Sequence, residues 1–400
     1  MIDFKALAQT FDTPLYVYDF DRITTRYEEL KKAFAGRKSL IAYAVKANSN
    51  LSVVGHLASM GAGADCVSIG EVRRALTAGV PKYKIIFSGV GKRDDEIEEA
   101  LRSDILLLNL ESEGEMKRVE AIAKRLGVKA RISIRVNPNI DPKTHPYIST
   151  GLHENKFGVD IETAKRMYIH ANNSDHLDPV GIHFHIGSQL TELEPIKEAA
   201  MIVADLVRSL LAVKIELKFF DVGGGLGIVY DNETTIAPYD YAQAILSTLH
   251  GLDLTVICEP GRFMVGDAGW FVTRVLYEKE NEGRRFVIVD GAMNDLLRPS
   301  LYNAYHKVEV LGKSGNETPA DVVGPVCESG DFFAQKRPLP PTEHNDLVIV
   351  HSAGAYGFVM ASNYNTRPRP AEVAISGGKA RCIRQRESFE DLIRLEKMCL

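Results

Sequence analysis

The sequence predicts an α/β protein: a (β/α)8 TIM barrel followed by a C-terminal antiparallel β-domain. Short, near-continuously apolar segments alternate with helical ones eight times between Ser39 and Gly261, as in a closed parallel sheet that is buried on both faces. Beyond Gly261 the β-rich segments are separated by Gly, Pro and Asn turns instead of helices, which is typical of antiparallel pairing. A doubly wound sheet is the alternative for the first part, and the regularity of eight units favours closure.

The eight strand segments of the predicted barrel are rich in β-branched residues, and helical stretches such as 111–126 and 192–211 lie between them. They are 39–46, 64–68, 84–89, 105–110, 129–137, 179–187, 216–224 and 254–261. The β-rich segments that follow are 270–280, 284–292, 306–312, 346–357 and 371–384. We therefore expect a barrel domain over 20–262 and a β-domain over 263–400. The N-terminal segment 1–19 contains a lone strand, TPLYVYD (13–19), which we expect to pair into the β-domain.

One connection is unusually long. Residues 138–159 follow the fifth strand and show little periodicity. A structureless loop of that length in a compact domain usually covers a site or is disordered. At the carboxyl end of a barrel strand, we expect it to act as a mobile lid.

Composition excludes several classes of function. A formal charge of -5 argues against nucleic acid or an anionic membrane as the main partner. The five cysteines are odd in number and contain no CxxC pair, so neither a disulfide framework nor a zinc finger fits. The N-terminus lacks the pattern of a signal peptide, and Asp205 and Arg208 interrupt the most apolar helical stretch, so no membrane span is expected. We expect a soluble, cytoplasmic enzyme.

Lys46 closes the first strand segment, IAYAVK. A lysine at a strand end usually extends its amine into solvent. At the mouth of a barrel, however, desolvation can lower the pKa of the amine enough for it to form a Schiff base with an aldehyde. The residues at the other strand ends favour this second interpretation.

Functional residues of such barrels gather at the carboxyl ends of the strands. Those ends carry Lys46, Asp65, Arg135, His183, His185, the loop Gly223-Gly224-Gly225-Leu226-Gly227, and Glu259-Pro260-Gly261-Arg262. His183 and His185 share a face of their strand and could bind zinc, but barrel metallohydrolases carry such a pair on the first strand. We therefore expect no metal.

The glycine run follows the seventh strand, whereas a dinucleotide fingerprint follows the first strand of its unit. In barrels, the loops after strands seven and eight often bind phosphate through backbone N–H groups, and Arg262 could add charge. A phosphate here, an aldehyde at Lys46, a carboxylate at Glu259 and an imidazole from strand six together match pyridoxal 5'-phosphate. A carboxylate on the pyridine nitrogen would keep the ring protonated and make it an electron sink.

The motifs AYAVKAN, HFHIGSQ, DVGGGLG, CEPGRF, CESGD and GAYGFVMASNYN resemble the alanine-racemase-like, fold-type III pyridoxal-phosphate decarboxylases over nearly the whole chain. The resemblance implies that Lys46 is the Schiff-base lysine and that His185 stacks on the ring. It assigns the phosphate region to Ser188, Gly223, Gly224, Gly225, Gly261, Arg262 and Tyr356. It also implies a homodimer with shared active sites, in which Cys327 of the partner subunit protonates the carbanion. Asp65, Glu71, Arg135 and His183 either orient the lysine and the ring or only pack the barrel.

The CESGD segment is similar to that of the diaminopimelate branch of this family, because Glu328 follows the cysteine where ornithine-type members carry aspartate. Arg298 and Tyr302 match positions that, with Arg262 and Tyr356, bind the distal end of the substrate. For Arg298 alone, a surface ion pair is the alternative. The resemblance implies decarboxylation of meso-2,6-diaminopimelate at its D-centre to L-lysine and CO2, the last step of lysine biosynthesis. Three alternatives remain: a family decarboxylase acting on arginine, ornithine or carboxynorspermidine, an amino-acid racemase, and a non-catalytic regulatory homologue.

Overall fold

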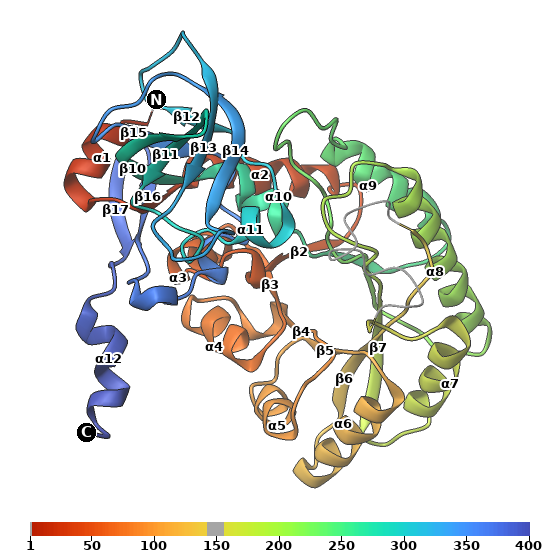
Figure 1. The fold of residues 1–400 in the computed structure, drawn as a ribbon. Helices are drawn as coiled ribbons and strands as arrows, with labels where there is room; N and C mark the ends of the chain where they lie inside the picture. Colours follow the sequence, from red (N-terminus) through yellow and green to blue (C-terminus); the bar gives the residue numbers. More distant parts are fainter. Residues whose placement is uncertain (1, 142–155) are drawn as a thin grey trace. The chain divides into compact units, whose positions relative to one another are not determined.

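Eight parallel strands close into a barrel, each paired with its neighbours in sequence order and the last with the first (Figure 1). They are β2 (Ser39–Ala44), β3 (Gly63–Cys66), β4 (Ile85–Phe87), β5 (Leu107–Leu110), β6 (Ala130–Arg135), β7 (Leu177–His183), β8 (Phe219–Asp221) and β9 (Thr255–Cys258). The computed structural model describes residues 2–141 and 156–400. The predicted (β/α)8 barrel is confirmed, and side chains such as Ala42, Ile86 and Ile257 pack together in a buried cluster.

Helices surround this ring of strands. They are α2 (Phe20–Ala33), α3 (Leu51–Ser59), α4 (Ile69–Thr77), α5 (Asp94–Arg102), α6 (Glu113–Leu126), α7 (Ile161–Asn172), α8 (Glu194–Ala212), α9 (Pro238–Leu246) and the short α10 (Arg262–Val265). Side-chain caps define several starts: the hydroxyls of Ser68 and Ser112 accept hydrogen bonds from the third backbone N–H of α4 and α6. α6 ends at Gly127, whose φ of 67° suits the left-handed turn that stops the helix.

The chain divides into two compact units. The barrel unit comprises Thr24–Ile228 and Thr234–Met264, and the β-unit comprises Met1–Ile23, Val229–Glu233 and Val265–Leu400. The strands of the β-unit are β1 (Leu15–Asp19), β10 (Gly269–Asn281), β11 (Arg284–Val289), β12 (Val308–Val310), β13 (Thr318–Val323), β14 (Phe332–Leu339), β15 (Leu347–Val350), β16 (Ala371–Ser376) and β17 (Lys379–Arg384). Its helices are α1 (Phe4–Phe11), α11 (Arg298–Tyr302) and α12 (Phe389–Lys397).

The sheet of the β-unit runs in the order β14-β13-β11-β10-β1-β16-β17, with β15 also paired to β10 and β12 to β15. The sequence predicts antiparallel pairing, and most pairs are antiparallel, but β1 pairs parallel with β16 and β11 parallel with β13, so the sheet is mixed. The N-terminal strand β1 lies between β10 and β16. Its Leu15 and Val17 share a buried cluster with Leu7 and Ala8 of α1.

Several boundaries differ from the sequence-based expectation. The segment 371–384 is a hairpin, β16 and β17, because Gly377 and Gly378 have positive φ angles and turn the chain. β13 and β14 were not expected. β7 ends at His183, four residues earlier than predicted. Most of the long loop predicted at 138–159 lies outside the described residues. None of the helices described within residues 2–141 and 156–400 has the length and apolar composition that a membrane span requires.

Candidate active site

Lys46 lies in a single 3-10 turn, Val45–Ala47, directly after β2. Its Nζ donates a hydrogen bond to Asp65 Oδ2 of the neighbouring strand β3, over 2.7 Å. The Asp65 side chain is fully buried, whereas the Lys46 side chain is 38% exposed. Burial raises the pKa of Asp65 and nearby Glu259 raises it further, while Lys46 opposes both effects. The pair therefore holds an accessible amine at a fixed place at the carboxyl ends of the barrel strands.

The glycine turn after β8 packs against two neighbouring loops. Gly223 and Gly225 have φ angles of +64° and +115°, which side chains rarely adopt. A Cβ on Gly224 would lie 2.2 Å from the carbonyl oxygen of Glu259. No side chain fits at these positions, so the turn packs its backbone directly against the loops after β7 and β9. A turn without side chains also lets a phosphate approach closely.

His185 lies two residues beyond the end of β7, beside this turn. Its Nδ1 accepts a hydrogen bond from the backbone N–H of Gly224 over 3.3 Å. Burial lowers the pKa of His185 well below its usual value, and the charges of Arg135 and Lys46 lower it further. The imidazole is therefore neutral near neutral pH, with its proton on Nε2, and presents an uncharged flat face.

Arg262, at the start of α10, is buried, and its Nη2 donates to the Ser188 hydroxyl over 3.2 Å. Gly261 immediately precedes it in the loop after β9. These contacts bring the loops after β7 and β9 together next to the glycine turn. The family resemblance implies that Ser188, Gly261 and Arg262 belong to one phosphate site, and the structure brings the loops that carry them into contact.

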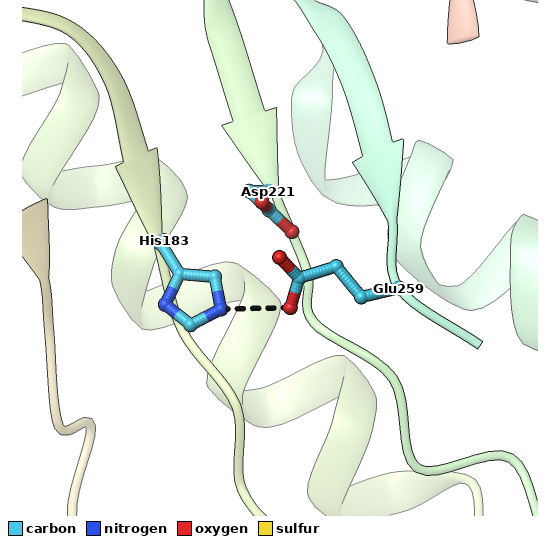
Figure 2. Close-up of side chains that lie close together, drawn as sticks. All are labelled: His183, Asp221 and Glu259. Atoms are coloured by element: carbon cyan, nitrogen blue, oxygen red, sulfur yellow. Dashed lines mark hydrogen bonds and ion pairs between the residues drawn. The ribbon is translucent and has the colours of Figure 1, made fainter. Parts of the chain in front are cut away.

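Three buried side chains meet at the ends of β7, β8 and β9: His183, Asp221 and Glu259 (Figure 2). One ring nitrogen of His183 and one carboxyl oxygen from each of the two acids all lie within 4.8 Å of one another. His183 Nε2 is 3.1 Å from Glu259 Oε2. Burial opposes ionisation of Glu259, but the charge of His183 and its hydrogen bond hold the pKa of Glu259 at about 2. Burial, and then the adjacent Glu259, raise the pKa of Asp221 well above its usual value. The zinc alternative paired His183 with His185, whereas the structure groups His183 with two carboxyl groups instead.

Glu71 and Arg135, whose roles the sequence leaves open, both make hydrogen bonds that hold loops of the barrel in place. Glu71 accepts a hydrogen bond from the backbone N–H of Val67 over 2.8 Å, which holds the loop before α4. Arg135 donates to buried Glu111 over 3.0 Å. Glu111 also accepts from the backbone N–H of Gly158, over 2.8 Å. The Arg135–Glu111 pair therefore anchors the described end of the long loop at the carboxyl end of β6.

The predicted substrate residues of the β-unit occupy two places. Arg298 begins α11 and is only 7% exposed, so it is no surface residue. Its Nη1 lies 3.1 Å from His306 Nε2, and its guanidinium stacks 4.7 Å from the centre of the Tyr230 ring. A surface ion pair is therefore excluded as its role. Tyr302 ends the same helix.

Cys327 and Glu328 are exposed in the loop between β13 and β14. The backbone N–H of Cys327 donates to the side-chain oxygen of Asn365 over 3.0 Å. A hydrogen bond with Glu328 raises the pKa of Tyr364. Tyr356 is partly buried in a turn with a φ of 55°. The GAYGFVMASNYN motif thus supports the CESGD loop through Asn365 and Tyr364, which sequence reasoning did not single out.

Comparison with known proteins identifies the family. The pyridoxal-binding domain of the pyridoxal-dependent decarboxylases matches residues 20–266. The chain is 60% identical to the diaminopimelate decarboxylase of Campylobacter jejuni over 400 residues, all of both chains. It is 58% identical to that of Helicobacter pylori strain J99, over 99% of this chain and 98% of the other. The solved structure of Helicobacter pylori diaminopimelate decarboxylase complexed with L-lysine matches with a TM-score of 0.97 and 57% identity over 100% of both chains.

The chain belongs to the diaminopimelate decarboxylase family. The barrel site has the features that the pyridoxal cofactor of this family needs. It offers an accessible amine at Lys46 and a glycine turn whose close packing leaves no room for a side chain. Glu259 Oε1 is buried and has no hydrogen-bond partner among the described residues, which suits a ring N–H. The residues therefore fit pyridoxal phosphate.

One residue that the structure places among these strand ends was not predicted from the sequence. Asp221 is the last residue of β8, and its Oδ1 accepts from the backbone N–H of Gly223 over 3.0 Å. The available signal was the aspartate that opens DVGGGLG, since Asp before a glycine run often holds a turn. That signal alone does not reveal its proximity to Glu259 and His183.

Proposed function

We propose that the protein binds pyridoxal 5'-phosphate at Lys46 and decarboxylates meso-2,6-diaminopimelate at its D-centre, releasing L-lysine and CO2. The observation that carries the proposal is the Lys46–Asp65 pair at the mouth of the barrel, where an accessible amine is held over a buried carboxylate. The name shared by relatives 58–60% identical over nearly their whole length supports the substrate, as does the L-lysine in the related Helicobacter pylori structure.

The barrel residues would hold the cofactor at three points. Lys46 Nζ would bind its aldehyde carbon. The Gly223–Gly225 turn, with Ser188, Arg262 and Tyr356, would surround the phosphate. When bound, the cofactor supplies an electron sink for the bond that breaks between Cα and the departing carboxylate.

Glu259 and His185 would set the electronic environment of the ring. Glu259 is ionised, since its pKa is about 2, and an anion at the ring nitrogen keeps that nitrogen protonated. His185 is neutral and would stack on the ring without adding a positive charge that competes with protonation of the nitrogen. Together they favour electron flow toward the ring.

The β-unit would read the distal end of the substrate. Arg298 and Tyr302, with Arg262, would bind the distal carboxylate, and Glu328 the distal ammonium. This orients the scissile bond and rejects amino acids that lack the distal pair. In a homodimer, Cys327 of the partner subunit would return a proton to Cα.

The test is product identification. Purified protein loaded with pyridoxal phosphate is incubated separately with meso-, LL- and DD-diaminopimelate, L-ornithine and L-arginine, and the amine product and its configuration are determined. We expect L-lysine from the meso form and no comparable turnover of L-ornithine or L-arginine, with Lys46→Ala as the inactive control. Preferred turnover of ornithine or arginine would overturn the substrate assignment, and absence of any decarboxylation would overturn the activity.

A further inference from the structure

Asp221 has no role in the mechanism given above, yet it lies within the site. Its side chain is buried at the end of β8, and Oδ1 accepts from the Gly223 N–H over 3.0 Å. Oδ2 is also buried and has no hydrogen-bond partner among the residues that the structure describes. An ionised oxygen left in this state carries a large desolvation penalty.

Asp221 Oδ2 has no hydrogen-bond partner among the described residues, and the same is true of Glu259 Oε1, at the end of the neighbouring strand β9. Figure 2 shows the carboxyl groups of Asp221 and Glu259 pointing toward each other from the ends of β8 and β9. Glu259 Oε2 faces His183 Nε2 at 3.1 Å, while Glu259 Oε1 is buried without a partner in the described part of the chain. Two buried carboxyl groups this close do not both ionise readily, and a shared proton would satisfy both orphan oxygens.

We propose that Asp221 carries this proton and donates it to Glu259, and thereby acts as a positioning residue that fixes Glu259 relative to the glycine turn. Its relevance to catalysis rests on the proposed function. The proton belongs on Asp221 because Glu259 faces the imidazole of His183, which stabilises an anion, whereas Asp221 accepts only from a neutral amide. The raised pKa of Asp221 and the lowered pKa of Glu259 agree with this assignment.

Gly223, in the glycine turn, is hydrogen-bonded to both Asp221 and Glu259. The backbone N–H of Glu259 donates to the Gly223 carbonyl over 2.7 Å, and the Gly223 N–H donates to Asp221. A hydrogen bond from Asp221 to Glu259 would close this ring of contacts. A carboxylate oxygen accepts more than one hydrogen bond, so Glu259 could still face the ring nitrogen while bound by Asp221.

Asparagine is the discriminating substitution. In Asp221→Asn the side-chain oxygen can still accept from Gly223 and the amide can donate to Glu259, without any charge. We expect this variant to keep the affinity for pyridoxal phosphate and the kcat/KM within about fivefold of wild type, and Asp221→Ala to lose about tenfold or more in both. Asp65→Asn is the matched control, because Asp65 faces an ammonium group and should not tolerate loss of its charge. Equal losses in Asp221→Asn and Asp221→Ala would overturn the proposal.

A second measurement uses the protein without cofactor or substrate, so it remains informative even if the proposed reaction is wrong. A buried acid whose pKa is raised on folding contributes stability below its unfolded pKa, near 3.9, and loses it as the pH rises through the folded pKa. Asparagine does not titrate. The thermal midpoint of Asp221→Asn minus that of wild type should therefore increase as the pH rises from about 5 to about 9.

Other ionisable groups surround Asp221. They are His183 on β7, Cys258 and Glu259 at the end of β9, Asp65 on β3 and Tyr241 on α9. His183, Cys258, Asp65 and Tyr241 are present in both proteins, so their contributions largely cancel, and the difference between the two midpoints reports the interacting pair Asp221 and Glu259. A difference that stays constant with pH, or that shrinks as the pH rises, would show that Asp221 is ionised in the folded protein and would overturn the proposal.

Discussion

Lys46 Nζ and Asp65 Oδ2 lie 2.7 Å apart, with the carboxylate fully buried and the amine side chain more than one-third exposed. A second lysine near the strand ends makes the contrast clear. Lys92 is 1% exposed, and its amine donates to Glu115 and to the carbonyls of Gly89 and Asn109, which uses all three of its hydrogens. Only the first of these two amines can be reached by a ligand.

Borohydride reduction of the cofactor-loaded protein should therefore fix pyridoxal phosphate to the peptide that contains Lys46. Peptide mapping by mass spectrometry provides the measurement. Lys46→Ala should remain folded and lose this specific label, because the Lys92 amine is buried and engaged and cannot replace Lys46. A label on Lys92 or on any other lysine in the wild-type protein would remove Lys46 from the site.

Replacing Gly224 by alanine should damage the cofactor site. The new Cβ would meet the carbonyl oxygen of Glu259 at 2.2 Å, and backbone cannot move aside as a flexible side chain can. We expect the affinity for pyridoxal phosphate to fall at least tenfold, with a lower thermal midpoint. Gly91→Ala is the control, because a Cβ there would have nothing within 4 Å. If Gly224→Ala binds the cofactor as well as Gly91→Ala does, the turn is not part of the phosphate site.

Glu328→Ala and Arg298→Ala should each reduce kcat/KM for meso-diaminopimelate by roughly 30-fold or more. A substrate ion that loses its partner in a closed site costs about 2–5 kcal/mol. The absorption spectrum of the bound cofactor should not change, since neither residue is proposed to touch the phosphate or the ring nitrogen. Arg298→Lys separates charge from packing against Tyr230, and thermal midpoints show whether the β-unit is intact. Indifference of kcat/KM to both alanine substitutions would contradict the proposed recognition of the distal centre.

Mixing two inactive variants tests whether active sites are shared between subunits. Lys46→Ala and Cys327→Ala should each be nearly inactive. After subunit exchange, half of the dimers would be mixed and each would contain one intact site, so activity should return to about a quarter of wild type. Exchange is checked independently with differently tagged subunits. Exchange without recovery of activity would exclude sharing.

Glu278 should stabilise the β-unit in a pH-dependent manner. Arg285 donates to its two oxygens over 2.8 and 2.9 Å and, with further donation from Thr342, lowers the pKa of Glu278 to about 2. A lowered carboxyl pKa contributes stability above the unfolded pKa, near 4.3, and that stability is lost as the pH falls toward about 2. Wild type should therefore melt above Glu278→Gln at neutral pH, and the gap should close between about pH 4.5 and 2.

Glu280→Gln is the matched control on the same strand, since Glu280 makes no ion pair within the described residues and its substitution should leave the melting profile nearly unchanged. A gap between wild type and Glu278→Gln that is independent of pH would contradict an electrostatic origin.

The sequence was informative about the barrel because each strand is buried on both faces and therefore appears as a continuous apolar run. It was less informative about the β-unit. β13 contains Pro319 and β14 contains Lys336, Arg337 and Pro338, so neither shows the composition of a strand. The parallel pairing of β11 with β13 depends on contacts between distant segments, which no local pattern encodes.

Some residues of the site could be predicted from the sequence and others could not. Lys46, Glu259 and the glycine turn could be found because each follows a recognisable strand and has a distinctive chemistry. Asp221 could not be assigned, because an aspartate at a strand end is common and its meaning depends on the spacing of β8 and β9. The burial of Arg298 could not be predicted either, since its guanidinium stacks on Tyr230, which lies far from it along the chain.

The position of β1 in its sheet has a consequence for biosynthesis. β1 ends at Asp19, but its two neighbours begin at Gly269 and Ala371. A ribosome adds about 5–20 residues per second, so Tyr16 and its flanking apolar residues emerge many seconds before either partner strand exists. During translation the barrel segments can assemble while the apolar strand β1 remains unpaired. This interval is where a nascent chain of this topology is most exposed to chaperones and to aggregation.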